Sequence, residues 1–387
     1  MRDNYVWIIG GGLVQRPLIQ EYIKRGYEVV VSDMNRKCAC EDIATVWVIN
    51  TRDWQSHISK ALRIRNHPPS AVATAGTDAG HVVSYLGSIF NLPACKVSAA
   101  IDAKYKDRMR EVIGYAHPWF DLPFSDDKVV FKAPCVVKSA DSMASRGVGV
   151  VLESKDMDAA VASAWEESWQ GTSRIVIEEL LIGDPHIEVT SDWFVVDGWV
   201  HYINGVRRIF PDFGISSGYI SPYTIPEEIH DIARRAVTCL GVNEGPFKMD
   251  LMYDDRYGWC LLECATRWSG EFDHSIAAKY TTGRDLTSSY VDYTLGLGNP
   301  EPWDGRIDQF LYSWAPHHPG HIVGQRMIDF YRSHEDVVEV IPTGKSIPMT
   351  YGSNADRALF VMIVGQDEGD IINKAREMDI TWQSMNT

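Results

Sequence analysis

The chain of 387 residues has no long apolar run, no paired cysteine motif and no basic segment. No window approaches about eighteen uninterrupted apolar residues, so we expect no membrane-spanning helix. The seven cysteines are scattered and odd in number, which indicates reduced thiols, no structural zinc and a cytoplasmic protein. A formal charge of −15 without a basic patch argues against nucleic acid as a partner.

The first hundred residues alternate strands and helices. Residues 5–10, 27–33 and 71–76 have the composition of buried strands, and residues 15–25 have that of a helix. A strand, a glycine turn, a helix and a second strand make a βαβ unit, so we expect a small parallel α/β domain. A helix is then predicted over 103–113, with Asp102 as its N-cap.

The middle of the chain is predicted to be mostly antiparallel. Polar and apolar residues alternate over 186–205 as in a hairpin, and the helix predicted over 226–241 is closed by Gly241. The other elements predicted here are a helix over 156–169 and strands over 174–181, 246–253 and 258–266. Residues 305–387 mix short strands and helices and form a third, smaller unit.

Two segments imitate phosphate-binding loops. GGGLVQ has Gln15 where a dinucleotide fingerprint needs its third glycine, although Asp33 stands at a strand end where an acid could hold a ribose. We favour a tight turn over a cofactor site there. TGKS at 343–346 lacks the upstream glycine of a P-loop, because Glu339 occupies that place.

The segment PCVVKSADSMASRGVGVV has far more residues between its two apolar runs than a hairpin needs. Lys138 ends the first run, and small or polar residues follow. A lysine at a strand end followed by a loose loop of small residues suits a lid over phosphates.

Charged residues gather on one face of the strands GPFKMDLM and LLECATR. Because side chains alternate along a strand, Lys248 and Asp250 share one face, as do Glu263 and Arg267, and a hairpin would bring all four together. A salt-bridged sheet surface is the simpler interpretation. Beside a phosphate lid, however, two carboxylates would repel phosphate unless a divalent cation lay between them. The segments together therefore indicate a magnesium–nucleotide site.

These segments resemble the ATP-grasp superfamily of carboxylate–amine ligases, with domains arranged as in biotin carboxylase. The likeness covers nearly the whole chain. It implies an α/β and α+β protein with an N-terminal parallel α/β domain over 1–100, a two-part ATP-grasp domain over 101–300 and a C-terminal α/β domain over 301–387. The flexible small subdomain would span about 115–180.

The resemblance also implies nucleotide contacts. DAKYKDRMRE matches the segment with the first nucleotide lysine, Lys104, and VIEELLIGDPHIEV resembles the hinge between the subdomains. There Glu178 would accept a hydrogen bond from the adenine amino group, the backbone of Glu179 and Leu181 would pair with the adenine edge, and His186 or Glu188 would meet the ribose. The ATP-binding set implied in this way is Lys104, Lys138, Ser145, Gly147, Glu178, Glu179, Leu181, His186, Glu188 and Lys248.

In the same resemblance Asp250 and Glu263 would bind Mg²⁺, with Mn²⁺ as an alternative, and the catalytic residues would be Arg267 and Lys138. Most members carry a metal-binding asparagine where this chain has Ala265. This departure implies a substitute ligand, a slow enzyme or a non-catalytic protein.

We therefore expect a ligase that uses ATP to activate a carboxylate as an acyl phosphate and joins it to an amine, of the amino-acid or dipeptide type. Its partners would be the small-molecule carboxylate and amine, and homodimers are frequent in the family. The substrate residues expected are Arg207, Arg208, Ser269 and Gly270. The alternatives are a carboxylase or purine-pathway type that uses carboxyphosphate, a non-catalytic nucleotide-binding protein, and an NAD-dependent oxidoreductase.

Overall fold

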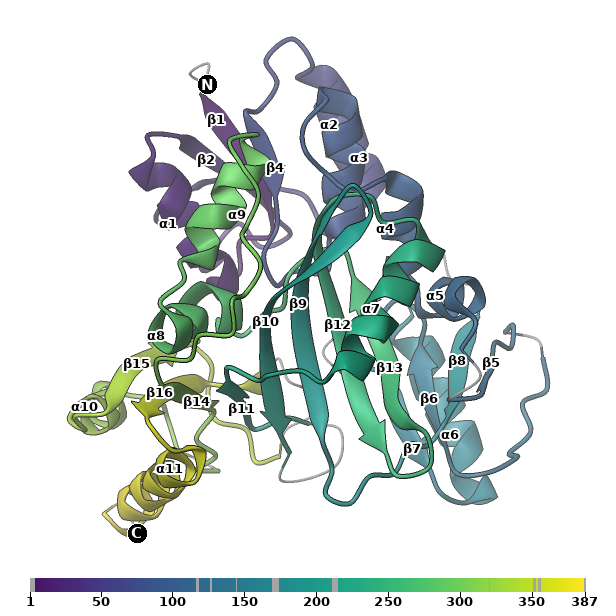
Figure 1. Cartoon of the computed structure of the whole chain (residues 1–387), viewed down its shortest axis with the longest axis vertical. Coiled ribbons are helices and arrows are strands. Elements are labelled where there is room, and N and C mark those ends of the chain that lie inside the picture. The colour runs from purple at the N-terminus through teal and green to yellow at the C-terminus, as the bar shows by residue number, and fades with distance from the viewer. Residues whose placement is uncertain are drawn as a thin grey trace.

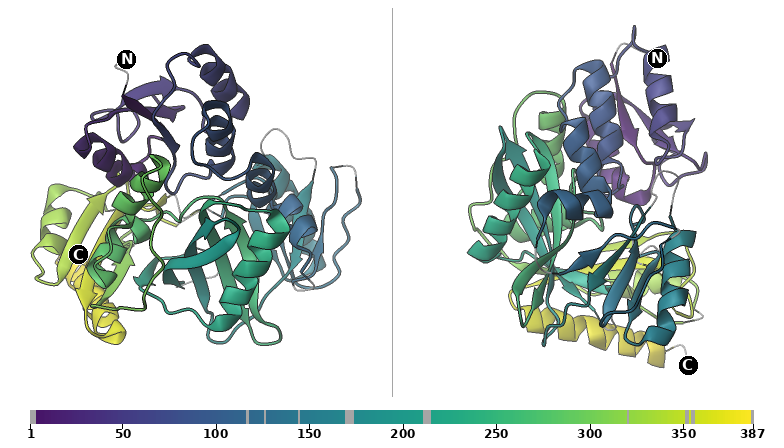
Figure 2. Two further views of the ribbon diagram at one scale, coloured as in Figure 1. Left: turned by 45° about the horizontal axis from the view of Figure 1, so that its top comes forward. Right: turned by 90° about the vertical axis from the view of Figure 1, so that its right-hand side faces the viewer.

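The computed structural model describes residues 4–385, except 116–117, 126, 144, 169–173, 211–214, 320, 351–352 and 354–355. The described residues form three sheets. In Figures 1 and 2 the N-terminal sheet lies at one end of the molecule, with the central sheet and a small sheet below it and the C-terminal helices at the other end. The chain is a mixed α/β protein, as predicted.

The N-terminal sheet is parallel, with strand order β3-β2-β1-β4. Its central strand is buried along its whole length, as expected for a parallel sheet covered by helices. Its strands are β1 (Tyr5–Ile9), β2 (Glu28–Asp33), β3 (Thr45–Val48) and β4 (Ala71–Ala73), and its helical segments are η1 (Leu13–Gln15), α1 (Arg16–Lys24), α2 (Trp54–Arg63) and α3 (Gly80–Phe90). The predicted βαβ unit is therefore confirmed.

The glycine turn after β1 is not built for a dinucleotide. The side chain of Gln15 is fully buried and donates to Ile9 O, Thr74 Oγ1 and Thr77 Oγ1. Asp33 is already engaged, because its Oδ2 accepts from the backbone N–H of Gly11 at 3.0 Å. The residue that replaces the third glycine thus ties this turn to β4.

The helix predicted over 103–113 is wrong in its extent, because two helices meet there. α4 (Val97–Lys104) ends where Tyr105 takes an extended conformation with φ −95° and ψ 117°, and α5 (Lys106–Ile113) begins after it. The N–H of Lys106 donates to Ala140 O at 2.9 Å instead of continuing α4. Asp102 consequently lies inside α4 and is not an N-cap.

The small sheet is antiparallel, with order β5-β8-β6-β7. Its strands are β5 (Phe120–Asp121), β6 (Cys135–Ser139), β7 (Val148–Val151) and β8 (Ile175–Glu179), covered by η2 (Ser154–Asp156) and α6 (Met157–Glu166). The lid segment is the loop between β6 and β7, as predicted.

The central sheet has eight strands in the order β13-β12-β9-β10-β11-β14-β16-β15. Three of them come from beyond residue 300, so the sheet continues through the C-terminal segment. The strands are β9 (Glu188–Val196), β10 (Trp199–Ile209), β11 (Gly218–Ser221), β12 (Gly245–Asp254), β13 (Gly258–Ala265), β14 (Phe310–Trp314), β15 (Val337–Pro342) and β16 (Leu359–Gly365). The helical segments are α7 (Glu227–Leu240), η3 (Asp273–Ala277), α8 (Ala278–Thr282), α9 (Leu286–Thr294), α10 (Gln325–Arg332) and α11 (Glu368–Ser384).

Helix α7 covers one face of the central sheet (Figure 1). It starts after Pro226 with two acidic residues in its first turn and ends at Gly241, whose φ of 71° is the left-handed conformation that glycine adopts at little cost. Beneath it the fully buried cross-strand partners Trp193 and Phe247 form part of the core. The opposite face of these strands carries the polar side chains of Thr190, Asp192, Lys248 and Asp250.

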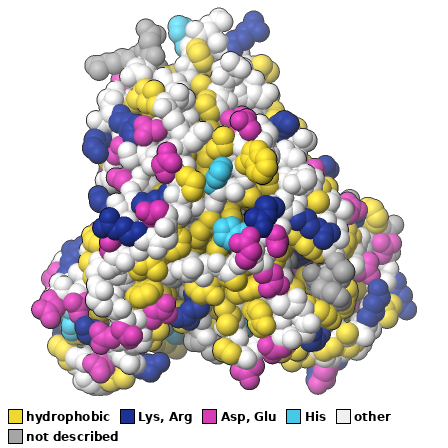
Figure 3. Space-filling model, in the orientation of Figure 1, with side chains coloured by type: hydrophobic (Ala, Val, Ile, Leu, Met, Phe, Trp, Pro, Cys, Tyr) yellow, Lys and Arg dark blue, Asp and Glu magenta, His cyan; other side chains and the backbone are white. Residues whose placement is uncertain are grey.

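On the face drawn in Figure 3, acidic and basic side chains are interspersed, with apolar side chains between them. In the described part of the chain no helix is both long and apolar enough to cross a bilayer.

Candidate active site

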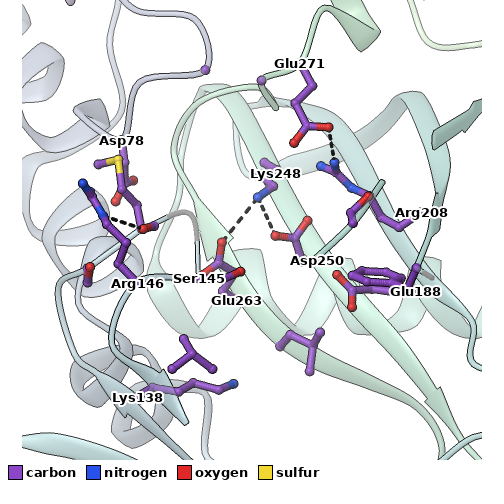
Figure 4. A pocket seen from close by; sticks show the side chains of 18 of the residues that line it. Asp78, Lys138, Ser145, Arg146, Glu188, Arg208, Lys248, Asp250, Glu263 and Glu271 are labelled. Atoms are coloured by element: carbon purple, nitrogen blue, oxygen red, sulfur yellow. Dashed lines mark hydrogen bonds and ion pairs between the residues drawn. The ribbon is translucent and has the colours of Figure 1, made fainter. Parts of the chain in front are cut away.

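A cavity of about 640 Å³ lies where the three sheets meet. Figure 4 shows charged side chains from different parts of the chain pointing into it. The turn after β1 and the end of β4 contribute Gly12, Leu13, Val14, Gly76 and Asp78; the lid contributes Ser142, Met143, Ser145 and Arg146; and the C-terminal segment contributes Thr343, Lys345, Arg357 and Phe360.

The acid pair predicted on β12 and β13 is present. Asp250 and Glu263 are direct cross-strand partners, and both line the cavity. The ammonium of Lys248 lies between them, 2.5 Å from Asp250 Oδ2 and 3.4 Å from Glu263 Oε1 (Figure 4). Burial alone would raise the pKa of Glu263, but the ammonium groups of Lys106 and Lys248 hold it well below its ordinary value.

Lys104, the predicted first nucleotide lysine, and Lys106 lie in different positions relative to the cavity. Lys104 is not among the described residues that line the cavity, because its ammonium is bound by Asp78 Oδ2 at 2.5 Å and by Asp141 O. Lys106, two residues later and on the next helix, does line it and reaches Glu263 Oε2 at 3.3 Å. The break at Tyr105 turns the two lysines in different directions.

The second lysine, Lys138, lines the cavity and is held by Glu178. Glu178 is 2% exposed, and its two oxygens accept from Arg110 at 2.5 Å and from Lys138 at 2.6 Å. Burial would raise the pKa of Glu178, but Arg110 and Lys138 lower it to about 2. The predicted contact of Glu178 with an adenine amino group stays a prediction, and both of its oxygens already accept hydrogen bonds in this structure.

The hinge segment after β8 is clamped by the turn between β12 and β13. Arg256 donates to Glu179 Oε1 and Leu180 O, and the buried carboxylate of Asp254 accepts from the N–H of Ile182 at 2.7 Å. Leu181 lies between these fixed points and lines the cavity, as do Glu179, His186 and Glu188. The hinge backbone is thus held where the sequence places the adenine edge.

The lid loop folds over one side of the cavity. Ser145 lines it, whereas Gly147 is not among the described residues that do. Gly147 instead shapes the turn: its φ is 65°, and a Cβ there would come within 2.7 Å of Glu167 Cβ. Position 144 of the lid lies outside the described residues.

Arg267 lies beside Asp78, which follows strand β4 of the N-terminal sheet. It lines the cavity, its Nη1 donates to Trp268 O, and its Nε lies 3.7 Å from Asp78 Oδ1. Burial would raise the pKa of Asp78, but Lys104 and Arg267 hold it far below its ordinary value. A carboxylate from the segment after β4 therefore forms an ion pair with the predicted catalytic arginine.

The two arginines predicted for substrate differ. Arg208 lines the cavity and binds Glu271 Oε2 at 2.6 Å, whereas Arg207 is not among the described lining residues and pairs with Glu368 of α11. Glu271 also binds Arg357 at 2.6 Å. Burial would raise the pKa of Glu271, but these two guanidinium groups lower it to about 2.

Ser269, another residue predicted for substrate, is fully buried away from the cavity lining, whereas its neighbour Gly270 is in that lining. The Ser269 hydroxyl contacts both Asp192 Oδ2 and Asp273 Oδ2. A hydroxyl has one hydrogen to donate, so a proton on the Asp192 carboxyl group would let both contacts be hydrogen bonds. Burial and the charge of Asp273 accordingly raise the pKa of Asp192 to about 7.

This second acid cluster also brings ligand-type atoms of Asp192, Asp273 and His274 within 4.8 Å of one another. All three side chains are buried, and they are joined to the loop by hydrogen bonds, since Asp192 Oδ1 also accepts from the N–H of Ser269 at 2.8 Å. The cluster fixes the segment that carries Arg267 and Gly270 into the cavity.

The sequence analysis did not predict several charged residues of the cavity lining, among them Lys106, Asp78, Glu271 and Arg357. For Lys106 a signal existed, because it lies in the same quoted segment as Lys104. The other three come from distant parts of the chain and meet only in the folded protein.

No protein-family model matches the chain, and no curated protein matches its sequence. Solved structures do. An L-amino acid ligase from Bacillus licheniformis superposes with a TM-score of 0.77 at 17% identity and 98% coverage of both chains. A carboxyaminoimidazole ribonucleotide synthase from Aspergillus clavatus, solved with ATP, gives 0.75 at 13% identity and 98% coverage of both. A phosphoribosylglycinamide synthetase from Anaerococcus prevotii gives 0.68 at 13% identity, covering 97% of this chain and 98% of the other.

At these identities the likeness concerns the fold. The chain has the ATP-grasp fold over almost its entire length, which confirms the fold that the resemblance implied.

Proposed function

We propose that this protein is an ATP-dependent ligase that converts a carboxylate into an acyl phosphate and then joins it to an amine, with release of ADP and phosphate. The observation that carries the proposal is the opposed pair Asp250 and Glu263, which lines one cavity together with Lys106, Lys138 and Arg267. Structures with this fold have been solved with ATP and with ADP, and one of them is an L-amino acid ligase.

The chain's own residues would bind and position the reactants. Lys106 and Lys138 would bind phosphate oxygens of ATP, and the hinge backbone near Leu181 would meet the adenine. Arg267 would stabilise the negative charge that develops as the carboxylate attacks the γ-phosphate. The lid would exclude water, which otherwise hydrolyses an acyl phosphate.

Asp250 and Glu263 suit a magnesium ion, because both are carboxylates and the structure already places a cation, the Lys248 ammonium, between them. Bound there, Mg²⁺ would neutralise charge on the β- and γ-phosphates.

The substrate would bind beside Arg208, Glu271 and Arg357, which together carry one net positive charge and are mostly buried. This favours an anionic substrate such as a carboxylate.

ADP release should be measured over a panel of carboxylates crossed with amines, with bicarbonate as one member. ADP release that needs both a carboxylate and an amine is expected. Release with bicarbonate alone would favour the carboxyphosphate type, and tight ATP binding without any turnover would favour a non-catalytic nucleotide-binding protein.

A further inference from the structure

The predicted metal site contains a lysine between its two acids. Lys248 is 6% exposed, comes from the same strand as Asp250, and points into the cavity between Asp250 and Glu263 (Figure 4). A buried lysine is rare unless it is paired, and here two carboxylates surround it at 2.5 and 3.4 Å.

The strand register explains why the lysine fits. The direct cross-strand partner of Lys248 on β13 is Ala265. Partners on one face lie only about 5 Å apart at Cβ, so the single methyl group of Ala265 leaves room for the lysine stem. The same alanine offers no oxygen with which to bind a metal ion.

The four oxygens of the acid pair all have partners. Asp250 Oδ1 accepts from Thr190 at 2.7 Å and Oδ2 from Lys248, while Glu263 Oε1 faces Lys248 and Oε2 faces Lys106 at 3.3 Å. Each carboxylate oxygen has a further lone pair, so one divalent ion can still bind there together with phosphate oxygens and water. A second divalent ion between the two acids would have to displace the ammonium.

We propose that the ammonium of Lys248 is a resident cation that takes the place of a second metal ion, so that the site binds one divalent cation per nucleotide. This inference rests on the proposed function, since it assumes that ATP and a metal ion occupy this cavity. Lys248 would then belong to the phosphate-binding machinery permanently, without a dependence on metal concentration.

The test counts Mn²⁺ by electron paramagnetic resonance and the β,γ-imido analogue of ATP by equilibrium dialysis, on the full chain. Wild type is expected to bind one Mn²⁺ per bound nucleotide. Lys248→Met, and more clearly Lys248→Met with Ala265→Asn, should bind two. Lys248→Arg, which keeps the charge, and Lys155→Met, a change at a lysine that is 72% exposed, should keep a count of one.

Two Mn²⁺ per nucleotide in wild type would overturn the inference but leave the ligase proposal intact. A count of one in folded Lys248→Met and in the double variant would also overturn it, because Lys248 would then exclude nothing. If Lys248→Met does not fold, Lys248→Gln replaces it, with the same expected count of two and the same contrary outcome of one. Absence of any nucleotide or Mn²⁺ binding by wild type would refute the ligase proposal together with the inference.

Discussion

Two acid pairs lie against the same face of the central sheet, and their buried carboxyl groups are stabilised in different ways. Asp250 and Glu263 are surrounded by the ammonium groups of Lys248 and Lys106. Asp192 and Asp273 meet around the hydroxyl of Ser269. Lys248 lies between the pairs, since Asp192 is its cross-strand partner on β9, yet its ammonium contacts Asp250.

The two pairs differ in the direction in which their surroundings shift a carboxyl pKa. Cations keep the pKa of Glu263 well below its ordinary value, whereas burial and the neighbouring Asp273 raise the pKa of Asp192 to about 7. Only the first pair lines the cavity. An acid pair flanked by ammonium groups can bind a metal ion and phosphate beside them, while a pair in which one carboxyl group has a raised pKa is suited to holding a loop.

The largest expected effect comes from Glu263→Gln. The amide keeps the shape of the side chain but removes its charge. The rate of ADP release should fall more than about 100-fold, because loss of a residue that only supports a metal ligand already costs up to about 100-fold. Circular dichroism should show an unchanged fold.

The matched control is Asp192→Asn in the other pair, assayed at pH 8, where turnover should stay within about threefold of wild type. Equal losses of ADP release in both variants would contradict the contrast between the pairs, because the second pair would then also contribute to catalysis.

A third acid, Asp254, extends the comparison to the hinge. Burial would raise its pKa, but Arg256 and the N–H of Ile182 lower it to about 2. Arg256→Ala should weaken ATP binding about tenfold, as loss of positioning by about 1.4 kcal/mol would, with kcat within about twofold. Calorimetric titration of ATP and of tripolyphosphate separates adenine from phosphate contacts, and Arg256→Lys should recover part of the loss. An equal loss of tripolyphosphate affinity would contradict a role at the hinge.

The second acid pair should appear in the pH dependence of stability. Its environment raises the pKa of Asp192 from about 4 in the unfolded chain to about 7 in the fold, so the folded protein holds a proton that the unfolded chain releases. Stability from this group is therefore present below pH 4 and is lost as the pH rises to 7. Asparagine at this position can donate to Ser269 permanently, so Asp192→Asn should gain about 1–3 kcal/mol relative to wild type between pH 5 and pH 8.

Urea unfolding at four pH values measures that difference, and subtraction of the wild-type curve removes the titration of other groups. The groups that face Asp192 include Asp273, His274 and Ser269, the cross-strand partner Lys248, and Tyr202. A difference in unfolding free energy that does not change with pH would show that the pair is not protonated in the fold.

The sequence predicted the first acid pair but not the second. Alternation along two strands placed Asp250 and Glu263 on one face, and the register confirms that they are partners. Ser269 and Asp273 follow β13 in a loop and a π-helical turn, where no period applies, so their meeting with Asp192 on β9 could not be predicted.

The same limit explains the lysines. Helical periodicity continues smoothly through 103–113, whereas the break at Tyr105 depends on a hydrogen bond from Lys106 to Ala140, some thirty-five residues away in sequence. Asp78 and Arg357 reach the cavity from opposite ends of the chain. Local sequence patterns predict the fold and the faces of the strands. They do not predict which distant residue pairs with each charged side chain.

The smallest effect should come from Thr190→Val. The Thr190 hydroxyl contacts the first acid pair, as the Ser269 hydroxyl contacts the second. The Thr190 hydroxyl, however, donates to Asp250 at 2.7 Å and accepts from Arg208 Nε at 2.9 Å. One hydrogen therefore satisfies both contacts, and no additional proton is needed. Valine keeps the shape, so the loss should be about 1 kcal/mol of unfolding free energy, measured in urea, and less than about fivefold in ADP release. Ser269→Ala offers the direct contrast: it should lose more stability than Thr190→Val, and its loss should depend on pH. Similar losses of unfolding free energy that do not change with pH in both variants would contradict this contrast. The two hydroxyl groups would then have the same role, and the two acid pairs would not differ in protonation.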